Sequence, residues 1–269
     1  MELDQDLREG VIAVANAAAA AILEVYGRDF DVSQKADDSP VTAADLAAHR
    51  CIVDGLARLT PDIPVLSEES SEAHIARRRD WDRLWLVDPL DGTREFVKRN
   101  GEFTVNIAYI QDCVARYGVV QAPVTGATWH GGPGLGAWRR DAGGERPVRI
   151  REPARAPLRV AASRSHRTRE AIDFIARMGE TEAIGLGSSL KFCLLAEGGL
   201  DCYPRFGPTS EWDTAAAQAV VEGAGGQVSD WQGRPFRYNC RDTLLNGGFI
   251  ALGDPSLPWR RWAGLTGGG

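Results

Sequence analysis

Two aspartates three residues apart are the strongest chemical signal in this sequence of 269 residues. Asp88 and Asp91 directly follow the apolar run 85–87, which has the pattern of a buried strand. Pro89 fixes its own φ between them, and Gly92 permits a turn that a side chain would forbid. Carboxylates held on such a stiff turn suit a hard divalent cation, and Mg²⁺ also takes waters and phosphate oxygens. The alternative is an ordinary surface turn between a strand and a helix, where Asp, Pro and Gly are common.

Three further acids stand where a strand ends or a helix begins. Glu68 follows an apolar run at 63–66, Asp45 lies in the first turn of a predicted helix, and Asp213 opens another. Each has a plain structural explanation, because Glu68 fits a solvated loop and acids are favoured at helix N-termini. If Glu68 and Asp213 converge with the central pair, the oxygen-only cluster selects Mg²⁺ or Mn²⁺ over zinc. Two cations in such a cluster support in-line displacement at a phosphate, with a metal-bound water as the attacking group.

Regular elements must bring these residues together. The hydrophobic pattern predicts a helical turn at 94–98, a helix ending near 197, and helices at 4–26, 43–59, 168–178, 211–223 and 255–262. It predicts hairpins at 32–42 and 129–138, and strands at 63–66, 85–87, 104–110, 114–121, 158–161, 200–203, 227–229 and 249–252. Thr42 and Thr93 are suited to cap the helices that follow them. The basic segment 73–82 is expected to be exposed, and 141–157, which lacks a hydrophobic period, is the best boundary between two lobes.

Composition limits the class of protein. Hydrophobic residues make up 43% and charged residues 25%, which is ordinary for a globular chain with a sizeable core. The net charge of −6 argues against nucleic-acid binding by bulk electrostatics. Between Arg139 and Arg169, however, there are ten arginines against three acids. This imbalance is typical either of a polyanion site or of a solvated loop region.

Cysteine usage and the N-terminus bear on location. Five cysteines without a CxxC pair argue against a disulfide framework and suit a reducing cytosol. The start of the sequence is acidic, whereas a signal peptide needs a basic start and an apolar run. The apolar run 13–23 is about half a membrane span, so we interpret it as a buried helix. We therefore expect a cytoplasmic protein without an integral membrane segment. Peripheral contact with the inner membrane stays open, as does the choice between monomer and homodimer.

Three blocks of sequence carry a resemblance to a known family. They are Pro64-Val65-Leu66-Ser67-Glu68-Glu69, the block from Trp85 to Thr93, and Trp212-Asp213-Thr214-Ala215-Ala216. With them the chain resembles the magnesium-dependent, lithium-sensitive phosphatases related to inositol monophosphatase, over nearly its whole length. The segments 35–45, 94–104, 187–193 and 203–209 make it most similar to the bacterial 3′(2′),5′-bisphosphate nucleotidases of the CysQ type. The resemblance implies an α/β fold, a two-lobed α-β-α-β-α layered sandwich with the metals between the lobes.

The resemblance also implies residue roles. Glu68, Asp88 and the Leu90 carbonyl would hold one Mg²⁺, Asp88, Asp91 and Asp213 a second, and a third, weaker ion could lie near Glu69. Asp45 and Thr93 would orient and deprotonate the water, with Glu68 also counted as catalytic. Backbone N–H groups of Gly92 and Thr93 would meet the phosphate, and the nucleotide contacts would be Ser163, His166, Ser188, Lys191 and Arg205. Glu68, Leu90, Asp91 and Asp213 count among the substrate-binding residues as well.

The implied reaction removes the 3′-phosphate of adenosine 3′,5′-bisphosphate to give AMP, which clears a by-product of sulfate assimilation. The expected partner is thus a small phosphorylated nucleotide and not a nucleic acid. We expect lobe 1–150 to be an α+β unit with most metal ligands. Lobe 151–269 would be an α/β unit with Asp213 and the nucleotide contacts. One alternative is an inositol-phosphate or other sugar-phosphate phosphatase of the same fold, and another is a non-catalytic nucleotide-sensing protein.

Overall fold

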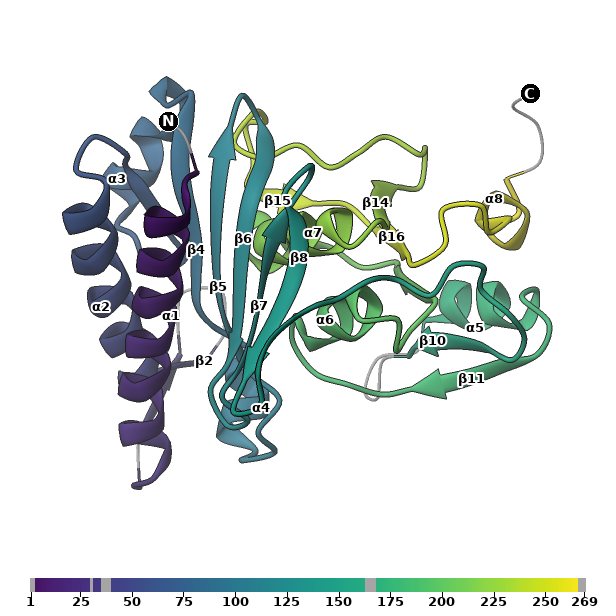
Figure 1. The fold of residues 1–269 in the computed structure, drawn as a ribbon, viewed down its shortest axis with the longest axis horizontal. Coiled ribbons are helices and arrows are strands. Elements are labelled where there is room, and N and C mark those ends of the chain that lie inside the picture. The colour runs from purple at the N-terminus through teal and green to yellow at the C-terminus, as the bar shows by residue number, and fades with distance from the viewer. Residues whose placement is uncertain (1–2, 30, 35–39, 163–167, 266–269) are drawn as a thin grey trace.

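The first half of the fold is a helical layer against an almost wholly antiparallel sheet. The computed structural model describes residues 3–29, 31–34, 40–162 and 168–265. Helices α1 (Gln5–Tyr26) and α2 (Ala43–Leu59) cover one face of a seven-stranded sheet (Figure 1). In order, its strands are β3 (Val65–Ser67), β4 (Arg83–Asp91), β5 (Thr104–Gln111), β6 (Val114–Ala122), β7 (Ala127–Gly132), β8 (Gly136–Asp141) and β9 (Gly144–Pro147). Only the β3–β4 pair among these strands is parallel.

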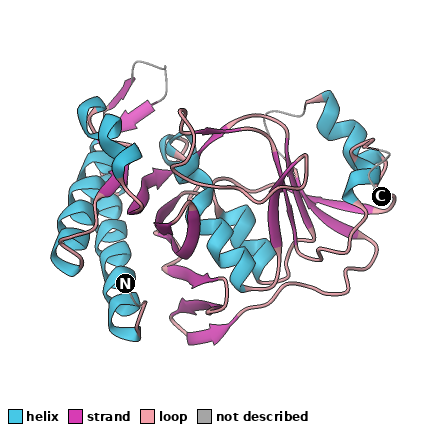
Figure 2. Cartoon of the chain, turned by 90° about the horizontal axis from the view of Figure 1, so that it is seen from above, coloured by secondary structure: helices cyan, strands magenta, loops and turns pink. Residues whose placement is uncertain are grey.

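A second helical layer and a second sheet follow. Helices α6 (Leu190–Ala196) and α7 (Glu211–Gly223) lie between the sheets, and α5 (Arg169–Ala176) and α8 (Trp259–Trp262) lie on the outer side (Figure 2). The second sheet has the order β11 (Thr181–Ile184), β10 (Leu158–Ala161), β12 (Cys202–Arg205), β16 (Phe249–Leu252) and β14 (Gln227–Asp230). The shorter elements are β1 (Val32–Gln34), β2 (Pro40–Thr42), α3 (Glu72–Ala76), η1 (Arg77–Asp80), α4 (Thr93–Val97), β13 (Thr209–Ser210) and β15 (Leu245–Asn246).

Three hydrophobic cores hold the layers together. One joins α1 and α2 to the first sheet, a second lies between the two sheets around α6 and α7, and a third joins the second sheet to α5 and α8. The layered α-β-α-β-α sandwich expected from the sequence is therefore confirmed. The first sheet is drawn from 65–147 and the second from 158–252. This division is compatible with the lobes 1–150 and 151–269, which stay a prediction because α6 and α7 serve both sheets.

Helix α1 is long and apolar enough to cross a membrane by length and composition alone. Six of its residues are buried, and the helix packs against α2 and the first sheet. Its apolar face is thus used as the face of a core helix, as the run 13–23 predicted.

Two local expectations need correction in detail. The strand expected at 85–87 runs from Arg83 to Asp91, because the register shifts between Asp88 and Asp91 and this irregularity accommodates Pro89. The segment 73–82 is largely exposed as expected, but it contains α3 and η1, and Arg78 within it is only 4% exposed.

Candidate active site

Asp88 and Asp91 lie at the end of β4, on either side of the register shift: Asp88 pairs with Asn106 and Asp91 with Thr104 of β5. Asp88 is 2% exposed, and its Oδ1 accepts the Leu90 N–H at 3.0 Å. Asp91 is held by the second lobe, since its Oδ2 accepts the N–H of Ser189 at 2.6 Å and lies 2.7 Å from the hydroxyl of the same residue. Asn106 on β5 lies 3.4 Å from the same Asp91 oxygen. The central pair is therefore fixed by its own strand and by the start of α6.

Asp45 and Asp213 are positioned by the same device, a capping box at the start of a helix. The N–H and hydroxyl of Thr42 each donate to Asp45 Oδ2 at 2.7 Å at the start of α2. At the start of α7, the Ser210 N–H donates to Asp213 Oδ2 at 2.9 Å. The explanation of these acids as helix-start residues is thus correct, and it also fixes each carboxylate in place.

The hydroxyl of Thr93 contacts the Asp45 carboxylate, as the expected catalytic pair requires. Its Oγ1 lies 3.3 Å from Asp45 Oδ1 and 3.2 Å from the Leu90 carbonyl oxygen. Thr93 does not cap α4, because the N-cap is Gly92, which has a φ of 92°. An added Cβ at Gly92 would lie 3.1 Å from the Glu102 carbonyl oxygen. Only glycine therefore fits this turn, which leaves the threonine hydroxyl for Asp45 and Leu90.

The electrostatics show that four acids converge. Burial, followed by the charges of Glu68, Asp91 and Asp213, raises the pKa of Asp88 well above its usual value. Burial and the charges of Asp91 and Glu68 raise the pKa of Asp213 to about 8. Each of these acids makes it harder for the others to ionise, so the cluster favours either protons or bound cations.

The oxygen atoms of these residues suit a hard cation, although the side chains do not surround a single ion position. Within the described ranges, no group of three or more His, Cys, Asp or Glu side chains is arranged to hold a metal ion. The charges of these acids still act on one another, so the acids lie within electrostatic reach without being gathered around one point. Mg²⁺ needs few carboxylates, because it retains waters and accepts carbonyl and phosphate oxygens. Asp88 and Asp213, together with Glu68 and the Leu90 carbonyl, meet that requirement.

The structure describes only three of the five substrate contacts that the sequence predicted in the second lobe. Ser163 and His166 lie outside the described residues. Ser188 has a φ of 44°, and its Cβ lies 3.3 Å from where a Cβ on Gly92 would be, so it borders the Gly92 turn. The Lys191 ammonium donates to the Ser188 and Leu186 carbonyls at 2.8 and 3.1 Å, which holds this loop together. The positive charge of Arg205 partly opposes the rise in the pKa of Asp213, and the Arg205 guanidinium lies 3.5 Å from the Pro208 carbonyl oxygen.

Sequence reasoning missed the residues that support these acids. Ser189 is 1% exposed, and its hydroxyl lies within 2.9 Å of both the Asp213 carbonyl and the Asn106 amide. Asn106 is a polar residue between the apolar Val105 and Ile107 of strand β5, and that signal could have found it. Ser189 lies in the segment 187–193 that contributes to the family resemblance, but nothing local distinguishes it from Ser188.

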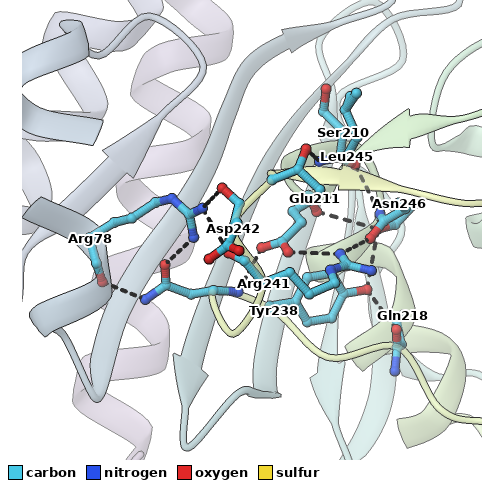
Figure 3. Close-up of polar contacts among 12 residues, drawn as sticks. Arg78, Ser210, Glu211, Gln218, Tyr238, Arg241, Asp242, Leu245 and Asn246 are labelled. Carbon is cyan, nitrogen blue, oxygen red and sulfur yellow. Dashed lines mark hydrogen bonds and ion pairs between the residues drawn. The ribbon is translucent and has the colours of Figure 1, made fainter. Parts of the chain in front are cut away.

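A buried polar network fixes the start of α7 (Figure 3). Glu211 is fully buried and accepts the Asn239 N–H at 2.7 Å and the Arg241 guanidinium at 2.8 Å. Arg78 reaches the same loop from η1 and donates to the Asn239 side chain and to the Arg241 and Asp242 carbonyls. The network therefore connects the segment after Glu68 to the helix that carries Asp213.

Comparisons with known proteins agree with this geometry. The model of the inositol monophosphatase family matches residues 3–258. The 3′(2′),5′-bisphosphate nucleotidase CysQ of Escherichia coli K12 is 52% identical over 241 residues, which span 89% of this chain and 96% of the relative. The solved CysQ of Bacteroides thetaiotaomicron has a TM-score of 0.81 at 39% identity and covers 93% of this chain and 98% of its own. An IMPase from Thermotoga maritima has a TM-score of 0.79 at 26% identity, over 97% and 96% of the two chains. The chain therefore belongs to the inositol monophosphatase family, as its sequence blocks predicted.

Proposed function

We propose that this protein is a Mg²⁺-dependent 3′(2′),5′-bisphosphate nucleotidase. It removes the 3′-phosphate of adenosine 3′,5′-bisphosphate and releases AMP and phosphate. The observation that carries the chemistry is the convergence of Glu68, Asp88, Asp91 and Asp213, where burial and then the neighbouring acids raise the pKa of Asp88 and Asp213. The name and 52% identity of the Escherichia coli relative support the choice of substrate.

The cluster divides naturally into two cation sites. Glu68, Asp88 and the Leu90 carbonyl would hold one Mg²⁺, and Asp88, Asp91 and Asp213 a second, while Glu69 is the candidate for a third. When bound, such ions supply an activated water and neutralise charge on the attacking and leaving oxygens. Asp88 belongs to both sets, and its burial and strongly raised pKa fit a carboxylate placed between two cations.

Asp45 and Thr93 would orient and deprotonate the attacking water, with Glu68 as a further catalytic residue. Asp45 Oδ2 is occupied by Thr42, so Oδ1 is the oxygen that faces the Thr93 hydroxyl. The threonine hydroxyl has one proton, which it can give to Asp45 while its oxygen accepts from water. Backbone N–H groups of Gly92 and Thr93 bind the phosphate oxygens, because the first N–H groups of a helix lack partners within it.

The second lobe supplies the contacts that select a nucleotide. Ser188, Lys191 and Arg205, together with Ser163 and His166, bind the nucleotide and its second phosphate. Ten arginines against three acids lie between Arg139 and Arg169, and this excess of positive charge suits a bisphosphorylated substrate. We propose a cytoplasmic enzyme that acts as a monomer or homodimer on this small molecule.

Phosphate release with Mg²⁺ tests the proposal, with adenosine 3′,5′-bisphosphate and inositol 1-phosphate compared at equal concentration. We expect a strong preference for the nucleotide. Asp91→Asn should lower kcat at least about 1,000-fold with the fold intact, since it removes a metal ligand. The exposed matched change Asp62→Asn should leave turnover unchanged.

The other outcomes separate the parts of the proposal. Preference for the inositol ester would keep the metal site and overturn the substrate. Full activity of Asp91→Asn would overturn the metal assignment. Nucleotide binding without turnover of either ester would favour a sensing protein.

A further inference from the structure

A basic cavity lies where the first sheet meets the second lobe, apart from the candidate active site. It has a volume of about 420 Å³, and Arg139, Arg146, Arg149 and Arg159 line it together with a single acid, Glu197. None of the converging acids contributes to its walls. The arginine-rich stretch that the sequence analysis could not assign is therefore, in part, the wall of a cavity.

The acids around the cavity do not balance its arginines. Arg139 is paired with Glu197 at 3.0 Å and with Asp141 at 3.1 Å, and Arg146 shares the same Asp141 at 3.0 Å. Arg149 has no hydrogen bond or ion pair in the part of the chain that the structure describes. These two carboxylates leave two of the four lining guanidinium groups unbalanced, in a protein whose net charge is −6.

Arg159 does not find a carboxylate of its own either. Its Nε lies 3.9 Å from Asp201, but Asp201 already accepts two hydrogen bonds from Arg151. Its Nη2 instead donates to the Gly198 carbonyl at 2.6 Å. A positive group fixed on a carbonyl keeps its full charge, so the wall formed by Arg159 is positive and held in place.

The cavity is shaped before any ligand arrives. The Arg139 guanidinium lies 5.1 Å over the Trp129 ring, and the indole N–H of Trp129 donates to Glu197 at 3.3 Å. Gly198 has a φ of 74°, and a Cβ there would lie 3.2 Å from the Arg149 carbonyl oxygen. The planar guanidinium forks of Arg139 and Arg159, fixed in this way, match the paired oxygens of phosphate better than lysines would.

We propose that this cavity binds a small molecule carrying two or more phosphate-type charges, at a site distinct from the active site. The volume lies within the usual range of small-molecule sites. Arg146 and Arg149 come from the end of the first sheet and the connection after it, and Arg159 comes from β10. A bound polyanion therefore links the two lobes, and its binding does not depend on the proposed reaction.

Pyrophosphate binding to metal-free protein tests this proposal. The full chain is stripped of metal on a chelating resin, because the uncompensated acids then repel anions from the active site. Isothermal titration at low salt should give a Kd below about 1 mM, the range of a weak specific site. The double variant Arg146→Ala/Arg149→Ala should bind at least tenfold more weakly. Neither side chain holds the fold, since Arg146 is 51% exposed and Arg149 is unpaired in the described chain.

The matched control carries the same loss of charge elsewhere. Arg28→Ala/Arg261→Ala removes two exposed arginines that do not line the cavity, and its Kd should stay within twofold of the wild type. A second titration with adenosine 3′,5′-bisphosphate identifies the source of the phosphates. Binding that is tighter than that of pyrophosphate and is weakened by Arg146→Ala/Arg149→Ala indicates a nucleotide in the cavity, and equal binding indicates recognition of the phosphates alone. Absence of binding by the wild type, or equal weakening in both double variants, would overturn the proposal.

Discussion

At the scale of the residue, single carboxylates serve both folding and chemistry. Asp45 and Asp213 each give Oδ2 to a capping box. Asp45 thereby turns its other oxygen toward Thr93. A capping contact alone contributes about 1 kcal/mol, whereas burying Asp213 among other acids opposes its ionisation, as its raised pKa records. The acids are therefore placed for cation binding at some cost to the metal-free fold.

The stability of the metal-free protein should fall as the pH rises from 5 to 8. The pKa of Asp213 is raised to about 8, and that of Asp88 is raised well above its usual value. Protonated, these acids stabilise the fold, and this stability is present near pH 4 and lost as pH rises through the folded-state pKa. Mg²⁺ binds the ionised form, so its stabilising effect should grow over the same interval. At about 100 times Kd it adds about 2.7 kcal/mol, or roughly 5–10 °C in Tm.

Thermal melting at each pH, with and without Mg²⁺, measures this dependence. Asp213→Asn removes one titrating group, so its metal-free Tm should change less with pH and respond little to Mg²⁺. Asp62→Asn, which is exposed, should behave as the wild type. A metal-free Tm that stays constant or rises from pH 5 to 8 would show that the acids do not converge as described.

At the scale of the element, the first turn of α7 must be held in position, because it carries Asp213. Asp213 lies two residues after Glu211, and the buried network around Glu211 ties that turn to the loop 239–242 and to Arg78 (Figure 3). Burial raises the pKa of Glu211, while Arg241 and the Asn239 N–H lower it. A carboxylate in that position needs all its partners, because an unpaired buried charge is costly.

Neighbouring arginines offer a matched test of this network. Arg78→Ala removes three hydrogen bonds and leaves the Arg241 and Asp242 carbonyls without their partner, so we expect a loss of about 3 kcal/mol in unfolding free energy. Arg79→Ala breaks an exposed pair with Asp242 and should cost below about 0.5 kcal/mol. Urea unfolding compares the two. Arg78→Ala should also need more Mg²⁺ for half-maximal activity, and similar stability of both variants would contradict the role given to Arg78.

The sequence predicted helices and strands better than it predicted the residues that hold them in place. Helix α7 was expected at 211–223 and is found there, because its apolar period and its capping acids are local signals. Arg78 was expected to be exposed because its partners are 161 to 164 residues away and leave no mark in the local pattern. Ser189 was missed for the same reason, since Asp91 lies 98 positions before it. Acids at element ends could be found from spacing, whereas contacts between lobes required the folded chain.

At the scale of the whole molecule, the site exists because α7 lies very close to the first sheet. Gly118 on β6 faces the backbone of α7, and a Cβ there would lie 2.0 Å from the Ala216 carbonyl oxygen. Gly223 at the other end of α7 would meet the Gly136 carbonyl oxygen at 2.5 Å. Glycines at both contacts let the helix approach closely, and this approach brings Asp213 to the acids at the end of β4.

Gly118→Ala should therefore separate the layers and disturb the active site together. The methyl group cannot be accommodated by a side-chain rotation, because the obstructing atoms are backbone, so α7 must shift or the chain must fail to fold. We expect a loss of at least about 3 kcal/mol, measured as a lower urea midpoint, and a weaker response to Mg²⁺. Gly247→Ala, where nothing lies within 4 Å, should change stability by below about 1 kcal/mol. If Gly118→Ala matched that control, the close packing of α7 on β6 could not be what sets the distance between Asp213 and the other acids.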